Sequence, residues 1–357
     1  MKRVAILLSL LLLLPLLGGC GATEEKQRFA AYEYRYFDTV TQVIGYADSK
    51  EEFDAVADRV FTMLEEYHEA FDIYYSYHTR NEGDPLASIR DVNRRVEAVD
   101  GTMTVTDTVY DLLSFSLEMY AATGGRTNVA MGAVLRLWHD CREDAAYDPA
   151  SATIPSMDAL TAAALHTDIS AILLDPLKKT ITVTDDKLTF DVGAIAKGYA
   201  AERIAEALLA DGIEGYLLNL GGNVRVVGAR PDGEPWQVGV ENPDRSAEEA
   251  YVAILDVTDG AVVISGTYQR YYEVDGVRYH HIIDPDTLMP EDRYRSVAVV
   301  AADSGMGDAF STALFNLDYE DGLALVENTD GVEALWVMPD GSLRHSSGFE
   351  RYINDNN

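Results

Sequence analysis

Residues 188–228 have the sequence LTFDVGAIAKGYAAERIAEALLADGIEGYLLNLGGNVRVVG. Apolar periodicity and glycine punctuation in this stretch predict a strand, a helix and then a strand pair around the Gly221-Gly222 turn, over 188–192, 194–211, 215–220 and 223–228. A helix that leads into an antiparallel strand pair differs from the strand and helix alternation of a doubly wound parallel sheet. The stretch therefore favours an α+β fold.

The rest of the chain continues this mixture. Apolar residues at helical spacing predict helices over 50–70, 105–123, 158–165 and 306–317. Aromatic and β-branched residues predict strands over 34–46, 171–174, 180–183 and 295–301, and two hairpins, over 271–274 with 277–283 and over 332–338 with 343–345. Strands outnumber helices in the second half, and the hairpins make its sheet antiparallel. We predict an α+β fold of mixed, largely antiparallel sheets flanked by helices.

The N-terminus has the pattern of an export signal. Lys2 and Arg3 precede an apolar run of 14 residues over 4–17, which suits the core of a signal peptide and is shorter than the roughly 20 residues of a membrane-spanning helix. Leu17-Gly18-Gly19-Cys20 is similar to a bacterial lipobox, in which the cysteine thiol receives the lipid. An ordinary signal peptide with a chance cysteine is the alternative.

These features divide the chain into three parts. We expect a signal peptide over 1–19, a lipidated, palmitate-bearing Cys20 with a polar tether over 20–30, and one folded domain over 31–357, because no Pro- or Gly-rich linker divides it. The lipid would hold the protein to the extracytoplasmic face of the cell membrane.

Charge and cysteine content exclude several classes of protein. The chain carries 28 basic and 60 acidic side chains, a formal net charge of −32, which argues against nucleic-acid binding and against charge-driven attachment to anionic lipid. Cys141 is the only cysteine besides Cys20, so no intramolecular disulfide is available once Cys20 is lipidated. We expect Cys141 to be a half-buried apolar residue.

A first candidate site is DVGAIAKG, residues 191–198, where the predicted strand gives way to the helix. Gly193 and Ala194 let a ligand approach the backbone, and the free amides and positive dipole end of the helix suit a phosphate. Lys197 adds a cation. The spacing is not that of a P-loop. A plain strand-to-helix turn with a surface lysine is the alternative.

A second candidate is YHHIIDP, residues 279–285. Neighbouring side chains of a strand point to opposite faces, so His280 and His281 cannot both face one site without a bulge. A histidine within reach of a hydroxyl can act as a general base near neutral pH. Surface or hairpin histidines are the alternative, and a zinc site lacks soft ligands because Cys141 is the only thiol.

A third candidate is GDAFST, residues 307–312. Asp308, Ser311 and Thr312 stand at i, i+3 and i+4 and so share one face of the predicted helix. A carboxylate with hydroxyls and few other protein ligands suits Mg²⁺ held against a diphosphate. A helix start, in which Asp308 caps the helix or complements its dipole, is the alternative.

Together and in this order, these segments resemble the ApbE family of FAD:protein FMN transferases. The resemblance extends over roughly 32–352 and rests on FDT (37–39), TNVAMGAVLRLW (127–138), DVGAIAKGYAAE (191–202), LNLGGNV (218–224), SGTYQRYY (265–272), YHHIIDP (279–285) and DAFSTALF (308–315). Many family members are exported lipoproteins, which agrees with the lipobox. The resemblance implies a transferase built on a single two-lobed domain.

The resemblance also implies the reaction and its partners. FAD is the donor, a Ser or Thr hydroxyl of an exported redox protein attacks the FMN-side phosphorus, and AMP leaves. Mg²⁺, or Mn²⁺, would neutralise the pyrophosphate and stabilise the leaving oxygen. The expected acceptors are electron-transport subunits or FMN-binding lipoproteins. Two alternatives stay open, namely Mg²⁺-dependent hydrolysis of FAD to FMN and AMP, and a non-catalytic FAD-binding lipoprotein.

Residue roles follow from the same resemblance. His281 is the implied base and His280 is expected to be structural, while Lys197 and the helix start would hold phosphate oxygens. The implied metal ligands are the Ala194 carbonyl and the side chains of Asp308, Ser311 and Thr312. The implied FAD contacts, of which the two aromatic residues would pack against the flavin or simply belong to the core, are Phe37, Tyr74, Arg126, Thr127, Asn128, Asp191, Lys197 and Ile282.

The chain departs from the family pattern in places. Many members have Ala-Phe-Asp where Arg126-Thr127-Asn128 stands, so this chain has a cation beside the expected FAD contacts. DPxTGxP, common after the histidine, becomes DPDTLMP over 284–290, which changes a turn. Neither departure touches Asp308, Thr312 or His281.

Overall fold

The computed structural model describes residues 26–77 and 79–354. At its centre is an eight-stranded sheet in the order β1-β2-β6-β7-β10-β13-β14-β15, and every neighbouring pair in it is antiparallel. Its strands are β1 (Gln27–Glu33), β2 (Thr41–Ala47), β6 (Tyr216–Leu220), β7 (Asn223–Val227), β10 (Gly260–Gly266), β13 (Ser296–Ala301), β14 (Val332–Val337) and β15 (Leu343–His345).

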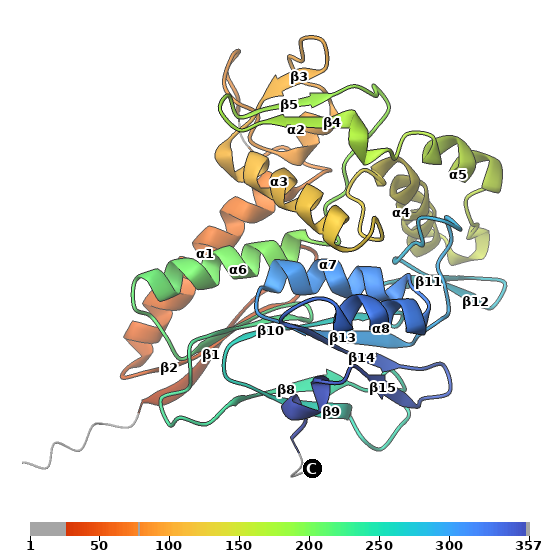
Figure 1. Ribbon diagram of the computed structural model, residues 1–357. Helices are drawn as coiled ribbons and strands as arrows, with labels where there is room; N and C mark the ends of the chain where they lie inside the picture. The colour runs from red at the N-terminus through yellow and green to blue at the C-terminus, as the bar shows by residue number, and fades with distance from the viewer. Residues whose placement is uncertain (1–25, 78, 355–357) are drawn as a thin grey trace, which may run out of the picture.

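Helices cover one face of this sheet and a hairpin covers the other (Figure 1). The helices are α1 (Lys50–Phe71), α6 (Ala196–Ala210), α7 (Ser304–Phe315) and α8 (Tyr319–Glu327), and the hairpin is β8 (Trp236–Glu241) with β9 (Tyr251–Val257). Because side chains alternate along a strand, Val299 of β13 packs with the helices and Val300 packs with the hairpin. The inner strands of the sheet, such as β7 and β13, are therefore buried on both faces.

A smaller lobe lies beyond α6 and α7 (Figure 1). It holds the three-stranded sheet β3-β5-β4 and the helices α2, α3, α4 and α5. The hairpin β11–β12 packs on α4 through Trp138, Tyr272 and Tyr279. The bounds are β3 (Thr102–Thr104), β4 (Ile172–Asp175), β5 (Thr180–Val183), β11 (Tyr271–Val274), β12 (Val277–His280), α2 (Ile89–Asn93), α3 (Asp107–Ala122), α4 (Gly132–Tyr147) and α5 (Met157–Ala164). The predicted α+β fold of largely antiparallel sheets with flanking helices is confirmed.

Some predicted segments have bounds that differ from those in the structure. The strand expected over 34–46 begins only at Thr41, because Phe37 and Asp38 have φ of 53° and 50°, a left-handed conformation that a strand does not contain. The segment 188–192 makes one isolated bridge, and its Phe190 N–H donates to the Asn93 side chain (2.6 Å) instead of a strand ladder. The tether expected over 20–30 overlaps β1, which begins at Gln27 and pairs with β2.

Other elements were not predicted, α4 above all. Its first turn has no capping side chain, and its sequence over 139–144, HDCRED, is polar. Strand β10, which has glycine at both ends, was not predicted either. Strand β12 ends at His280, so His281 lies just beyond it. Cys141 on α4 is half-buried among apolar side chains, as predicted.

The expected signal peptide and the lipidated Cys20 lie outside the described residues. Over 26–77 and 79–354, no helix combines the length and the apolar character that crossing a bilayer requires.

The close approach of α6 to α7 depends on Gly198. A Cβ atom at this position would lie 2.2 Å from the Ser304 carbonyl oxygen and 2.6 Å from the Asp308 Cβ. The buried Glu202 of α6 also links the two helices, since it accepts the Ser304 N–H of α7 (2.7 Å). Arg225 of β7 holds Glu202 in place by donating to both of its carboxylate oxygens (2.8 and 2.9 Å). The start of α6 is thereby fixed against the face of α7.

Candidate functional site

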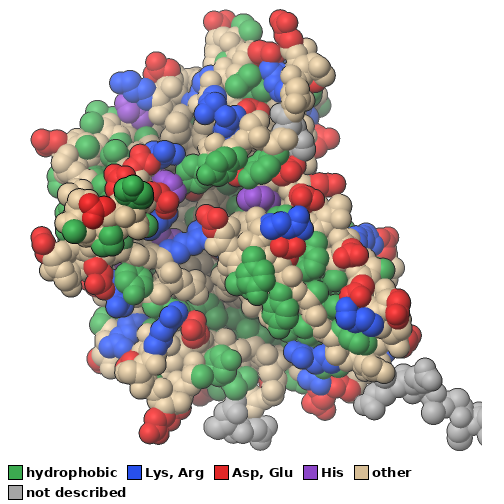
Figure 2. Space-filling model, turned by 180° about the vertical axis from the view of Figure 1, so that it is seen from behind, with side chains coloured by type: hydrophobic (Ala, Val, Ile, Leu, Met, Phe, Trp, Pro, Cys, Tyr) green, Lys and Arg blue, Asp and Glu red, His purple; other side chains and the backbone are tan. Residues whose placement is uncertain are grey.

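A cavity of about 510 Å³ opens between the two lobes, a volume typical of small-molecule sites. Figure 2 shows the hollow on the side opposite to the view of Figure 1, with histidine, lysine and arginine side chains around it. Although the whole chain is strongly acidic, the cavity lining has five basic side chains against four acidic ones, namely Arg35, Arg126, Arg142, Lys197 and Arg270 against Asp38, Asp72, Asp191 and Asp308. The cavity lining is therefore less acidic than the chain as a whole, which favours an anionic ligand.

The segment before α6 forms one wall. Asp191 Oδ1 accepts the Gly193 N–H (2.9 Å), which turns the backbone, and Ala194 also lines the cavity. Burial raises the pKa of Asp191, against the opposing effect of His139, Arg142 and Arg270. This wall combines a carboxylate with the backbone at the N-terminal end of α6.

Lys197 and Asp308 meet at the centre of the site. Lys197 Nζ lies 3.5 Å from Asp308 Oδ2 and 3.4 Å from the Gly193 carbonyl oxygen, and the Gly198 N–H donates to Asp308 Oδ2 (2.9 Å). Asp308 is only 4% exposed. Burial raises the pKa of its carboxyl, while Lys197 and the Gly198 amide lower it. A cation bound here would stabilise the buried carboxylate further.

One face of α7 borders the cavity, and it differs in part from the predicted face. Asp308 and Thr312 line the cavity as expected, and Asn316 extends the same row. Ser311 does not line the cavity. Its buried hydroxyl lies 2.8 Å from the Ser265 hydroxyl and donates to the Asp308 carbonyl oxygen (2.9 Å). Ser311 therefore lies outside the cavity lining, a placement that differs from the one expected of a metal ligand, because its hydroxyl is bonded on the sheet side of the helix.

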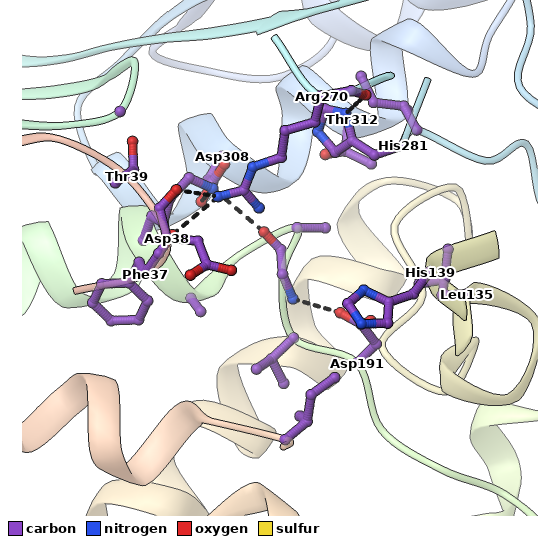
Figure 3. A pocket seen from close by; sticks show the side chains of 18 of the residues that line it. Phe37, Asp38, Thr39, Leu135, His139, Asp191, Arg270, His281, Asp308 and Thr312 are labelled. Carbon is purple, nitrogen blue, oxygen red and sulfur yellow. Dashed lines mark hydrogen bonds and ion pairs between the residues drawn. The ribbon is translucent and has the colours of Figure 1, made fainter. Parts of the chain in front are cut away.

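His281 also lines the cavity, close to Thr312 in Figure 3. Its Nδ1 lies 3.2 Å from the Arg270 carbonyl oxygen. Because a carbonyl only accepts, Nδ1 carries the proton and Nε2 keeps its lone pair. Burial, with Arg270, His280 and Lys197 nearby, lowers the pKa of His281 to about 3. The ring is neutral at physiological pH and has one nitrogen free to accept a proton.

His280 has the structural role that was expected of it. It is 3% exposed, its ring packs edge-on against Phe315, and its Nε2 lies 3.1 Å from the Glu291 carbonyl oxygen. The Ile282 N–H donates to its Nδ1 (3.2 Å), and Ile282 lines the cavity. His280 thus shapes the turn that presents His281.

Aromatic side chains line the outer part of the cavity. Phe37 packs edge-on against His68 (5.4 Å between centroids), and Tyr74 stacks on His139 (4.7 Å). Both expected aromatic contacts therefore face the cavity. They offer flat apolar surfaces of the kind that a planar ring system packs against.

The segment 126–128 is divided between cavity and core. Arg126 and Asn128 line the cavity, and Arg126 forms an ion pair with Asp286 (2.5 Å) in the turn that departs from the family pattern. Thr127 is buried and donates to the Ala309 carbonyl oxygen (2.6 Å). Thr127 therefore lies outside the cavity lining, a placement that differs from the one expected of an FAD contact.

Several cavity residues were missed from the sequence. His139 and Arg142, 2.9 Å apart, belong to α4, which was not predicted. Arg270 lies in the quoted motif SGTYQRYY but received no role. Asn223 and Asn316 are buried cavity residues whose side-chain oxygens have no hydrogen-bond partner among the described residues. His139 and Arg142 stand three positions apart on α4, and Asn316 stands eight positions after Asp308. These helical spacings were the sequence signals that could have identified the three residues.

The donors around Asp308 fit a hard cation. The Asp308 carboxylate, the Thr312 hydroxyl and the Ala194 backbone supply oxygen ligands, and the unpartnered Asn223 amide oxygen lies in the same lining. No group of three or more His, Cys, Asp and Glu side chains that could hold a metal occurs over 26–77 and 79–354. A site with one carboxylate suits Mg²⁺, which takes its other ligands from water and substrate phosphates.

Comparisons with known proteins agree with these features. Residues 37–336 match the model of a family described as the ApbE family. The FAD:protein FMN transferase of Treponema pallidum (strain Nichols) is 31% identical over 346 residues, which cover 93% of this chain and 90% of that protein. A FAD:protein FMN transferase of Klebsiella pneumoniae (strain 342) is 30% identical over 295 residues, 82% of this chain and 85% of that protein. The crystal structure of the ApbE protein of Thermotoga maritima matches with a TM-score of 0.77 and 25% identity, over 92% of this chain and 100% of that one.

Proposed function

Because this chain belongs to the ApbE family, we propose that it transfers FMN from FAD to a Ser or Thr hydroxyl of an acceptor protein and releases AMP. Its matched relatives are transferases, which confirms the predicted enzyme class. One observation carries the finer proposal. Lys197, Asp308, Thr312 and His281 come from three distant segments and line one cavity.

The basic side chains of the cavity would bind the pyrophosphate of FAD. Lys197 lies in the first turn of α6, 3.5 Å from Asp308 Oδ2, so a phosphate there would contact its ammonium group. The Ala196 and Gly198 amides of the same turn are already bonded, to the Val192 carbonyl oxygen and to Asp308 Oδ2. Phe37 and Tyr74 would pack against the rings, while Arg126, Asn128, Asp191 and Ile282 complete the lining. FAD, with its anionic centre and planar ends, has the chemistry that this cavity accommodates.

Mg²⁺ or Mn²⁺, when bound, would supply positive charge to the pyrophosphate oxygens. The residues that would hold it are Asp308, Thr312 and the Ala194 carbonyl. The Gly198 amide and Lys197 orient the Asp308 carboxylate before any ligand enters. This preorganisation removes the need to reorder the carboxylate during the reaction.

His281 would act as the general base. The acceptor hydroxyl gives its proton to Nε2 while its oxygen forms a bond to the FMN-side phosphorus. The bond from that phosphorus to the bridging oxygen breaks, and AMP leaves with the bridging oxygen and the electron pair. The lowered pKa of His281 keeps Nε2 unprotonated in the free protein, and the negative charge of bound FAD would raise that pKa toward a useful range.

We also propose where the reaction takes place. The lipobox-like sequence that ends at Cys20 supports an exported lipoprotein held at the extracytoplasmic face of the cell membrane. The acceptors would then be exported proteins, namely electron-transport subunits or FMN-binding lipoproteins. The net charge of −32 argues against nucleic acid as a partner.

Intact mass spectrometry of an acceptor tests the function. The purified protein would be incubated with FAD, Mg²⁺ and an exported FMN-binding protein of the same organism. We expect the acceptor to gain the mass of one FMN less one water. Asp308→Ala should abolish the gain, whereas Asp107→Ala, which removes an exposed carboxylate of α3, should preserve it.

The alternatives give different results in the same experiment. AMP accumulation without a mass gain would favour hydrolysis of FAD. Bound FAD with neither product would indicate a flavin-binding lipoprotein or an unsuitable acceptor, and a second acceptor would separate these two explanations.

A further inference from the structure

A short loop over 36–39, which we call the strap, borders the cavity beside Asp308 (Figure 3). Two consecutive residues of the strap, Phe37 and Asp38, have positive φ, 53° and 50°. This conformation is unfavourable for residues other than glycine and persists only where the surroundings hold it. The strap therefore needs contacts that fix it.

The strap is held from two sides. On the side of α1, the Phe37 N–H donates to His68 Nδ1 (3.3 Å), and the two rings are in contact. From across the cavity, Arg270 Nη2 donates to the carbonyl oxygens of Phe37 (3.0 Å) and Asp38 (2.9 Å). The two residues with left-handed backbone thus share one charged donor.

The backbone of Arg270 serves a second part of the site. Its carbonyl oxygen accepts the hydrogen bond from His281 Nδ1 (3.2 Å) that defines the tautomer of the ring. Figure 3 shows the side chain running from the neighbourhood of His281 and Thr312 to Phe37 and Asp38. One residue therefore contacts the strap and the expected base, although they are more than 240 positions apart in sequence.

We propose that Arg270 is a positioning residue that fixes both parts of the FAD site, the strap through its guanidinium group and the His281 ring through its carbonyl oxygen. The proposal rests on the proposed function, because the strap and the His281 ring would both act on bound FAD. Loss of the guanidinium group removes the hydrogen bonds that hold Phe37 and Asp38 at the cavity. The carbonyl oxygen of residue 270 remains, so the tautomer of His281 should not change.

The variant Arg270→Met separates these two contacts in the full chain. Arg270 is exposed, so the change removes charge and hydrogen bonds without leaving a core cavity. Arg278→Met is the matched control, because Arg278 is exposed on β12 of the hairpin that follows Arg270, and it contacts Glu273 and Tyr271 instead of the strap. Arg270→Lys keeps the charge but cannot present the forked donors of a guanidinium group.

Three measurements would be compared across these proteins, namely FAD affinity by fluorescence titration, hydrogen exchange of the strap amides, and the ¹⁵N spectrum of the histidine rings. For Arg270→Met we expect the Kd for FAD to rise about tenfold, because a factor of about ten corresponds to the net contribution of one hydrogen bond. Strap amides should exchange at least about tenfold faster, and His281 should keep its Nδ1–H signature. Arg278→Met should match the wild type, and Arg270→Lys should fall between.

Unchanged strap exchange and FAD affinity in Arg270→Met would overturn the role of the side chain. An Nε2–H tautomer of His281 in the wild type would overturn the role of the carbonyl. If the wild type binds no FAD, the proposed function fails, whereas strap exchange and the histidine spectrum still decide whether Arg270 holds the two parts.

Discussion

Replacing Gly198 by alanine would separate the two helices that form the centre of the site. The new Cβ would lie 2.2 Å from the Ser304 carbonyl oxygen and 2.6 Å from the Asp308 Cβ. Normal contact requires α6 and α7 to move apart by about 1 Å or more. Both Lys197 and Asp308 lie at this crossing, so the overpacking alters the core and the site together.

The expected magnitudes follow from this geometry. The cost of overpacking reaches about 3 kcal/mol at the upper end of its usual range, and we use this value because both new contacts are far shorter than normal. The better helix propensity of alanine offsets about 1 kcal/mol of this cost. We therefore expect a net loss of about 2 kcal/mol in urea unfolding. Displacement of the reacting groups by about 1 Å should reduce the rate of FMN transfer about 100-fold.

Gly322→Ala is a control with the opposite expected sign. Gly322 lies within α8, and a Cβ there would meet Leu314 and Trp336 at 3.4 Å, an ordinary contact. The change should raise the free energy of unfolding by about 0.5–1 kcal/mol and leave transfer unchanged. A Gly198→Ala protein with the stability and rate of the wild type would refute the reasoning.

Three further predictions concern charged groups. The folded protein keeps His281 neutral with a pKa of about 3, against an ordinary value of 6.5. Between these pH values the unfolded chain binds one more proton than the folded protein, so the free energy of unfolding falls as the pH drops below about 6.5. His281→Gln should reduce this pH dependence of the free energy of unfolding, measured in urea, and an equal pH dependence would contradict the assignment. Mg²⁺ with FAD should raise the melting temperature of the wild type, EDTA should abolish this shift, and Asp308→Ala should show no shift with or without EDTA. Glu202→Gln leaves the buried Arg225 with only the exposed carboxylate of Asp259 as an ion-pair partner and should lower the free energy of unfolding by about 3 kcal/mol, which denaturant titration would measure. A change below about 0.5 kcal/mol would show that the pair contributes little.

The sequence predicted those site residues whose placement follows from local periodicity. In a helix of 3.6 residues per turn, positions i and i+4 differ by about 40° and positions i and i+3 by about 60° in the other direction. Asp308 and Thr312 therefore share the cavity face, and Asn316 continues their row. Ser311 is rotated toward β10, where it contacts Ser265. Spacing identified the correct helix, and the packing against the sheet determined which residues face the ligand.

The residues that were missed depend on tertiary structure. His139 and Arg142 required α4, whose uncapped start and polar sequence gave a weak helical signal. Arg270 binds backbone carbonyl oxygens, which every residue carries, so no sequence pattern marks its partners. Thr127 faces the core while its neighbours Arg126 and Asn128 face the cavity, a distinction that only the packed structure makes.

In the proposed reaction, FMN passes from FAD to a protein hydroxyl within one cavity, and His281 is the base. The most direct test measures AMP and flavinylated acceptor in the same reaction, for the wild type and for His281→Asn. We predict one AMP per modified acceptor in the wild type and a loss of both products in the variant. AMP formed in excess of the modified acceptor, or equal transfer by the variant, would contradict this account.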